Sequence, residues 1–439
     1  MVSVTMKDIL VYSPPVNEIT KKWGVYAIPK LWREKGKELV VRFNGEQDIA
    51  FVDQMRQAEN LYFSSCDDGE SWHPVKNGEE IYDSAIFTGI GSPYCYLKDG
   101  RILAFRAKTD RKPITGMNSD KSFPWPDGES IACTYPYGEI PDECKGIERL
   151  CYDKDGNLMQ IDDVIMDFGE REVIVNYMAR TEEKNFSPVN QYLRPYIFKN
   201  PYLTEVMQLP DGTLGALTFG QHHAVKDRYC PEVYFIESHD EGITWRKRGT
   251  VAGSECDVPF GYSGDGNEMT LTRAKNGDLL VAMRMDQSII RYAMRADGSF
   301  EEVEPFWDCM VARSRDDGYT WEKPFSVSDS SVTPHIFSLE NGIVVVVYGR
   351  PGVHMKYSLD YGYTWSESVS IIGKTLAEER AAGRDDHDSR YGNTCSYSNT
   401  YVEILNEDTF LVLYNNLQYD DGDGLHHKAA FVKRITITR

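Results

Sequence analysis

The sequence lacks the features that would place it in a membrane or on a nucleic acid. Nowhere do about 18 apolar residues follow one another, and the start, MVSVTMKDILVYSPP, has no basic segment followed by an apolar one that would mark a secretory signal. Positive charge is also scarce: 48 Lys and Arg stand against 68 Asp and Glu, and the net charge of -20 would repel a phosphate backbone. We therefore expect neither nucleic acid nor a membrane as a partner.

Metal-binding and disulfide patterns are missing too. The nine cysteines contain no CxxC pair and no Cys and His spacing typical of zinc sites. An odd number of scattered cysteines is typical of buried thiols in a reducing compartment. We expect a cytoplasmic protein, or a secreted one whose signal has been removed, with no metal and no cofactor. Few segments show the periodicity of an amphipathic helix. The 27 Tyr and 8 Trp suit half-buried strands and sugar-stacking surfaces.

One octapeptide pattern, Ser-x-Asp-x-Gly-x-x-Trp, occurs four times. The copies are SCDDGESW (65–72), SHDEGITW (238–245), SRDDGYTW (314–321) and SLDYGYTW (358–365). In each copy the Asp can accept backbone N–H groups inside a turn, the Gly permits a positive φ, and the Trp can fold back over the hairpin. The pattern predicts a stapled β-hairpin whose Asp residues, Asp67, Asp240, Asp316 and Asp360, are structural.

A second repeat consists of two apolar strands joined by a turn with Gly or Asn. It occurs six times, beginning near residues 26, 92, 200, 267, 333 and 396. Alternation and β-branched or aromatic content favour strands over helices. Six such pairs, most followed by another hairpin, predict an all-β fold, a six-bladed β-propeller of four-stranded antiparallel blades. We expect a single domain over 1–439, with a long loop insertion at about 107–148 and another at about 366–391.

The Asp-containing turns resemble the Asp boxes of sialidases and related propeller proteins, over nearly the whole chain. The Asp box specifies architecture and says little about chemistry. The resemblance implies a retaining exo-glycosidase that hydrolyses a terminal acidic, sialic-acid-like sugar from a glycan. Sialidases use an Asp acid/base, a Tyr nucleophile supported by a Glu, and three Arg that hold the substrate carboxylate. A neutral Tyr suits this reaction because a carboxylate nucleophile would be repelled by the sugar's own carboxylate.

Several residues of this sequence match that catalytic pattern. Glu268 begins the fourth strand pair and Arg284 ends it, as the supporting Glu and the second triad Arg do in the family. Arg350, shortly before the last Asp box, resembles the third triad Arg. Tyr397, within a Ser-Tyr-Ser triplet that opens the sixth strand pair, looks like the nucleophile.

The acid/base and the first triad Arg are matched less closely. Asp53, in the loop ahead of the first Asp box, resembles the acid/base by its place, and Asp48 is its rival. The family's first triad Arg usually stands in a Tyr-Arg-Ile-Pro sequence, whereas here the stretch is YAIP, with Ala27 in the Arg position. The replacement candidates are Arg42, Arg56 and Arg106, of which Arg42 and Arg106 end second strands as Arg284 does. This departure leaves a different acidic sugar or a different reaction open.

Two pairs of histidines offer other readings. His222 and His223 follow the third strand pair; neighbours on a strand point to opposite faces, so both cannot ligate one metal. One of them is the candidate base in a second hypothesis, a propeller lyase or glycosidase acting on glycans that contain uronic acid or rhamnose. His426 and His427 are interpreted as part of a polar loop. A third hypothesis is a non-catalytic sugar-binding propeller. The oligomeric state is not indicated by the sequence.

Overall fold

The chain, in a computed structural model, divides into two compact units. The first unit comprises Met1–Ser84, Thr272–Ala282 and Val327–Arg439, and the second comprises Ala85–Leu271 and Met283–Ser326. The residues described are 2–16, 30–43, 60–82, 93–107, 121–124, 131–135, 147–167, 173–175, 203–221, 231–252, 268–285, 291–294, 300–303, 308–329, 332–349, 352–375, 378, 381, 401–425 and 427–439. Within these ranges no helix is long and apolar enough to cross a membrane.

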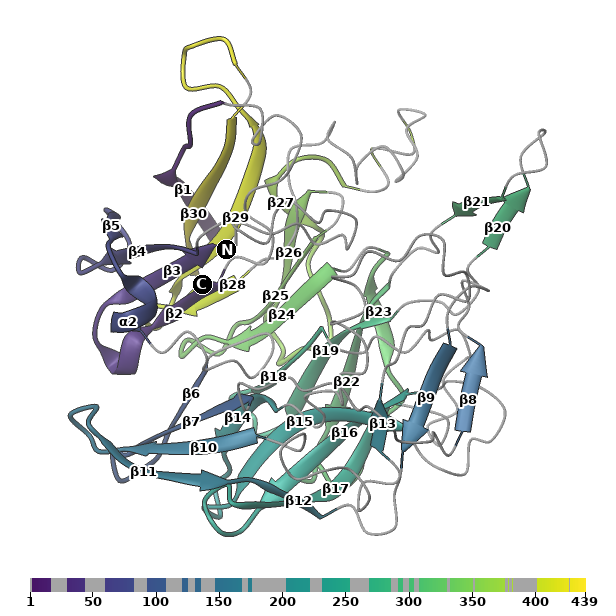
Figure 1. Ribbon diagram of the computed structural model, residues 1–439. Coiled ribbons are helices and arrows are strands. Elements are labelled where there is room, and N and C mark those ends of the chain that lie inside the picture. Colours follow the sequence, from purple (N-terminus) through teal and green to yellow (C-terminus); the bar gives the residue numbers. More distant parts are fainter. Residues whose placement is uncertain are drawn as a thin grey trace. The chain divides into compact units, whose positions relative to one another are not determined.

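Three four-stranded antiparallel sheets belong to the first unit (Figure 1). One has the order β2-β3-β4-β5, with strands β2 (Lys30–Arg33), β3 (Leu39–Phe43), β4 (Leu61–Ser65) and β5 (His73–Val75). Another has the order β24-β25-β26-β27, with β24 (Val332–Ser338), β25 (Val344–Gly349), β26 (Val353–Ser358) and β27 (Val369–Ile372). The third, β1-β30-β29-β28, joins β1 (Ser3–Tyr12) to β28 (Tyr401–Ile404), β29 (Thr409–Tyr419) and β30 (His427–Thr438). Two short helical turns, Glu34–Gly36 and Gly78–Ile81, accompany the first of these sheets.

A four-stranded and a five-stranded sheet belong to the second unit. The order β11-β10-β7-β6 contains β6 (Tyr94–Tyr96), β7 (Ile102–Ala107), β10 (Ile147–Tyr152) and β11 (Leu158–Asp163). The order β12-β17-β16-β15-β14 contains β14 (Thr204–Gln208), β15 (Leu214–Gln221), β16 (Pro231–Ser238) and β17 (Thr244–Ala252), with β12 (Ile165–Asp167) added in parallel to β17.

The sixth main sheet has the order β18-β19-β22-β23. Its strands are β18 (Met269–Arg273), β19 (Leu279–Met285), β22 (Asp308–Ser314) and β23 (Phe325–Ser328). The predicted fold class is confirmed: the chain is all-β, and these six sheets are the blades of a six-bladed β-propeller. Each predicted strand pair forms the first two strands of one blade. In four blades an Asp box joins the third strand to the fourth.

The segment predicted as a long loop at 107–148 contains strands as well. β8 (Lys121–Pro124) and β9 (Ile131–Tyr135) pair with each other, and β9 also pairs with β13 (Val173–Val175). A separate hairpin is formed by β20 (Arg291–Met294) and β21 (Phe300–Val303). The segment 107–148 was predicted as a loop because of its Pro and Gly content. The β-branched and aromatic residues of Ile131–Tyr135 nevertheless favour a strand.

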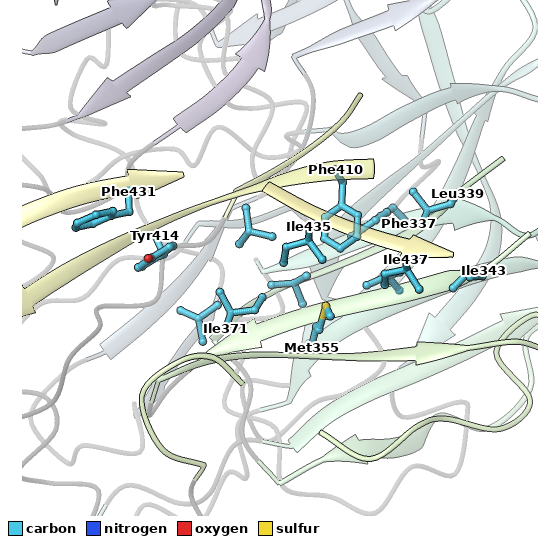
Figure 2. Close-up of a cluster of buried hydrophobic side chains, with 14 of the residues drawn as sticks. Phe337, Leu339, Ile343, Met355, Ile371, Phe410, Tyr414, Phe431, Ile435 and Ile437 are labelled. Carbon is cyan, nitrogen blue, oxygen red and sulfur yellow. The ribbon is translucent and has the colours of Figure 1, made fainter. Parts of the chain in front are cut away.

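Successive side chains of β29 point alternately into two hydrophobic clusters of the first unit. Phe410 and Val412 point into a cluster with Val345 and Val347 of β25, whereas Leu411 and Leu413 point into a cluster with residues of β2 and β3. Figure 2 shows the first cluster, in which the Phe410 and Phe337 rings lie 4.8 Å apart. Both faces of β29 are therefore buried, as propeller blades require. Each fully buried side chain of this size contributes about 2 kcal/mol.

Candidate functional site

Antiparallel alternation separates two ends of each blade. The start of the first strand, the end of the second and the start of the third lie at one end, and the turn between the third and fourth strands lies at the other. In the blade β18-β19-β22-β23, Glu268 directly precedes β18, Arg284 is the last residue but one of β19, and Asp308 begins β22. The Asp box starts at Ser314, where β22 ends. We call the end of a blade where its first strand starts the strand-entry end, and the end with the turn between the third and fourth strands the Asp-box end.

Glu268 and Arg284 form an ion pair at the strand-entry end. The Arg284 Nη1 donates to Glu268 Oε1 at 2.8 Å, and the Arg284 backbone N–H donates to the Glu268 carbonyl at 3.2 Å. The two side chains are 16% and 17% exposed, so the pair is partly desolvated yet reachable from solvent. The predicted supporting Glu and second triad Arg are thus brought together. Because a guanidinium carries five N–H donors, such a pair can also hold the carboxylate of a ligand.

Arg42 and Arg106 occupy the same position in their own blades as Arg284 does. Each is the last residue but one of the second strand, on β3 and β7 respectively. Arg106 Nε donates to Glu148 Oε2 on the neighbouring β10 at 2.8 Å, and Arg42 Nη2 donates to Asn60 Oδ1 at 3.3 Å. Three blades therefore carry an arginine at the strand-entry end.

The other predicted site residues lie outside the described residues. These are Tyr397, Asp53 and its rival Asp48, Arg350, Arg56, Ala27, and the histidines His222 and His223. Their roles stay predictions.

Glu205 is a candidate that the sequence reasoning missed. It is the second residue of β14, at the strand-entry end of its blade, where a β-bulge interrupts the pairing with β15 between Thr204 and Met207. Its φ of 48° lies in the left-handed region, which is uncommon for a residue other than glycine. Burial raises the pKa of the Glu205 carboxyl to about 8. Among the described residues, no hydrogen bond or ion pair joins this carboxyl to a partner.

The pair of strands that carries Glu205 also contains two buried hydroxyl groups. The side-chain hydroxyls of Thr204 and Thr218 are buried on β14 and β15, and neither has a hydrogen-bond partner within the described part of the chain. A carboxylic acid kept protonated near neutral pH is suited to general acid catalysis. The available signal in the sequence was a single Glu within the apolar run YLTEVMQL.

The Asp boxes are turn staples, as predicted. In the first copy, Asp67 Oδ1 accepts the Ser65 hydroxyl at 2.7 Å and the Ser71 backbone N–H at 2.9 Å, while Ser65 Oγ accepts the Gly69 N–H at 2.8 Å. The bonds donated by the Ser71 and Ser65 hydroxyls hold the pKa of Asp67 well below its usual range. Gly69 has a φ of 85°, and a Cβ there would lie 2.7 Å from Leu411 Cδ1. These carboxylates are committed to the fold.

The described residues contain one group of side chains that could hold a metal ion. It consists of Asp421, Asp423 and His427, in the hairpin between β29 and β30. This group belongs to a different blade from Glu268 and Arg284.

Comparison with known proteins identifies the fold but no close relative. No protein-family model matches the chain, and no curated protein matches it. A protein of unknown function from Dyadobacter fermentans DSM 18053 is 15% identical over 99% of both chains, with a TM-score of 0.52. The Hadza microbial sialidase Hz136 is 14% identical, with a TM-score of 0.44, over 92% of this chain and 65% of its own. The NanB sialidase from Streptococcus pneumoniae is 12% identical, with a TM-score of 0.45, over 98% of this chain and 70% of its own. The Dyadobacter likeness shows a fold shared by the two chains, and the sialidase likenesses are too distant to assign an activity.

Proposed function

We propose that this protein is a retaining exo-glycosidase of the sialidase type, which releases a terminal acidic sugar from a glycan. The observation that carries the proposal is the Glu268–Arg284 pair, with 2.8 Å between Nη1 and Oε1. A carboxylate and a guanidinium at this spacing provide both a base for a nucleophile and a cation for a substrate carboxylate. The resemblance to sialidases implies the same two residues as the supporting Glu and the second triad Arg.

In the proposed mechanism Tyr397 is the nucleophile. Its phenol proton passes to the Glu268 carboxylate as the phenol oxygen attacks the anomeric carbon, and Asp53 donates a proton to the departing glycosidic oxygen. The resulting glycosyl-tyrosine is hydrolysed when Asp53, now a carboxylate, takes a proton from the attacking water and Glu268 returns its proton to the tyrosine oxygen. Two inversions at the same carbon give net retention.

Arg284 and Arg350 hold the substrate carboxylate in this proposal. Ala27 removes the family's first arginine, and a missing charge-assisted contact costs about 2 kcal/mol of binding. Arg42, Arg56 and Arg106 are the candidates to restore it, and His222 is a further candidate contact to the sugar. A relocated cation would favour an acidic sugar whose carboxylate or ring substituents differ from those of common sialic acid.

A panel of aryl glycosides tests this function. The panel contains sialic acid, its deaminated relatives, uronic acids and neutral sugars, and release of the aryl group is followed together with the anomeric configuration of the product. We expect release from a keto-acid sugar with retention. Tyr397→Phe should abolish release, whereas Tyr319→Phe, at an exposed tyrosine in the third Asp box, should leave it unchanged.

Two results would overturn the proposal. An unsaturated product that absorbs ultraviolet light would indicate elimination, which is the chemistry of the lyase hypothesis. Binding of sugars without release of any product, across the whole panel, would indicate a sugar-binding propeller.

A further inference from the structure

The hairpin that joins β29 to β30 has an acidic, glycine-containing sequence, DDGDGL, over residues 420–425. Asp420 Oδ1 accepts the backbone N–H groups of Gly422 and Gly424 at 2.8 and 3.2 Å, and both glycines have positive φ, 102° and 74°. Asp420 is therefore used to fold the loop. In Figure 1 this hairpin is the yellow loop beyond the ends of β29 and β30, beside the segment that follows β1.

His427, the first residue of β30, was expected in a polar loop but is buried. Its side chain is only 4% exposed, and its Nδ1 lies 2.6 Å from the carbonyl oxygen of Pro14. A carbonyl accepts hydrogen bonds only, so Nδ1 must carry the proton. In the neutral imidazole the lone pair then lies on Nε2, which is the tautomer that binds metal ions through Nε2.

The Nε2 atom faces two carboxylates. Asp423 Oδ2 lies 2.8 Å away and Asp421 Oδ1 lies 3.3 Å away, and the three atoms all lie within 4.8 Å of one another. Two carboxylate oxygens and an imidazole lone pair are all electron donors, so their convergence requires either a proton or a cation between them. Outside the two aspartates, Nε2 has no partner within the described part of the chain.

We propose that Asp421, Asp423 and His427 bind a divalent cation. An imidazole beside two carboxylates suits Zn²⁺ or Mn²⁺ better than Ca²⁺ or Mg²⁺, which prefer ligand sets made of oxygen alone. The bond from Nδ1 to the Pro14 carbonyl is the outer contact that orients a metal-binding histidine. Asp421 and Asp423, 38% and 43% exposed, leave the site open to ions from solvent.

The cation would strengthen the blade in which the two ends of the chain meet. Pro14 lies two residues beyond β1, and β1 pairs with β30 from Ser3–Thr438 to Tyr12–Ala430. A metal ion held by the hairpin and by His427 thus braces the contact between the hairpin and the segment after β1. Binding to the folded state alone raises its stability by mass action.

The test uses the full chain after treatment with a chelator. Zn²⁺, Mn²⁺ and Ca²⁺ are titrated separately by calorimetry, and the thermal unfolding midpoint is measured with and without each ion. We expect one equivalent of Zn²⁺ to bind more tightly than Ca²⁺ and to raise the midpoint. The double variant Asp421→Asn, Asp423→Asn should bind Zn²⁺ at least about tenfold more weakly and lose the rise in the midpoint.

The controls separate a specific site from general attraction to an acidic surface. Asp155→Asn changes an exposed acidic turn, Asp153–Asn157, that has no histidine, and it should bind Zn²⁺ as the wild type does. The two exposed aspartates can be replaced without disturbing the core, so the proposal stays testable even where His427→Gln fails to fold. Equal binding by the double variant and the wild type would overturn the site. So would the absence of Zn²⁺ and Mn²⁺ binding by the wild type at millimolar concentration.

Discussion

The two ends of a blade use carboxylates in opposite ways. At the Asp-box end, Asp316 accepts the Ser314 hydroxyl and the Thr320 N–H, each at 2.8 Å, and the Thr320 hydroxyl at 2.6 Å. At the strand-entry end, Glu268 shares its carboxylate with an arginine, and Glu205 has no partner among the described residues. A carboxylate that is bonded within its own turn stabilises the fold, whereas the carboxylates at the strand-entry end either pair with an arginine, as Glu268 does, or lie half-buried, as Glu205 does.

The two ends of a blade also differ in how far their sequences repeat. The Asp-box end repeats nearly the same eight residues in four blades, because each turn solves the same backbone problem. The strand-entry end differs from blade to blade: Arg106 faces Glu148, Arg284 faces Glu268, and Arg42 faces Asn60. The end of the blade where the sequence does not repeat is therefore the end that can differ in chemistry from one blade to the next.

Replacing one carboxylate by its amide at each end of the blade should give the largest difference in kcat between two variants. Glu268→Gln keeps the volume and a hydrogen bond to Arg284 but removes the base, so kcat should fall by about 10²-fold or more. Asp316→Asn should leave kcat within about twofold. Both variants are measured on the best substrate of the glycoside panel, with thermal unfolding as the check of folding. Equal losses of kcat in the two variants would contradict the assignment of chemistry to the strand-entry end.

Glu205 predicts a dependence of stability on pH with a definite sign. Its pKa is raised from 4.5 to about 8 in the folded protein, so between these values the folded state keeps a proton that the unfolded state has lost. The free energy of unfolding should therefore fall as pH rises from about 5 to about 8. The free energy of unfolding should fall by about 2 kcal/mol. This change is smaller than the one expected for a fully buried carboxyl, because the Glu205 side chain is only half-buried.

The control for Glu205 is Glu205→Gln, which does not titrate. Urea unfolding of the wild type and the variant at several pH values measures the difference between their free energies of unfolding. As pH rises, we expect the free energy of unfolding of the variant to increase relative to that of the wild type. A constant difference across this range would show that Glu205 ionises in the folded state as it does in the unfolded one.

Breaking an Asp box should have a moderate effect on stability. Asp316→Ala removes the acceptor of three hydrogen bonds within one turn and should lower the free energy of unfolding by about 2 kcal/mol. Asp317→Ala, at the neighbouring partly buried position with a φ of 58°, is the comparison. If Asp317→Ala destabilises the protein as much as Asp316→Ala, the staple role of the box is wrong.

The sequence predicted the blades well because their determinants are local. Alternation, turn residues and the Asp boxes lie within short segments, so all six strand pairs could be placed. The pairing of β1 with β30 was not predicted, since it joins residues 3 and 438 and no local pattern encodes it. Burial of His427 was missed for the same reason, because the carbonyl that it contacts is 413 residues away. Of the candidate site, Glu268 and Arg284 were selected by their resemblance to the sialidase pattern, and the structure pairs their side chains while their roles stay predictions. The left-handed backbone and the burial of Glu205 have no signature in its residue type.

The smallest predicted change in stability comes from a difference between two Asp boxes in the hydrogen bonding of their Trp indoles. The indole N–H of Trp321 donates to the Gly318 carbonyl at 3.1 Å, whereas the buried indole nitrogen of Trp365 has no hydrogen-bond partner within the described ranges. Trp321→Phe therefore leaves a carbonyl without its donor, while Trp365→Phe removes a donor that was already unsatisfied. Both changes remove similar apolar area, so Trp321→Phe should be the more destabilising by about 1 kcal/mol in urea unfolding. Equal free energies of unfolding for the two variants would mean that the indole bond adds nothing and that the ring alone staples the hairpin.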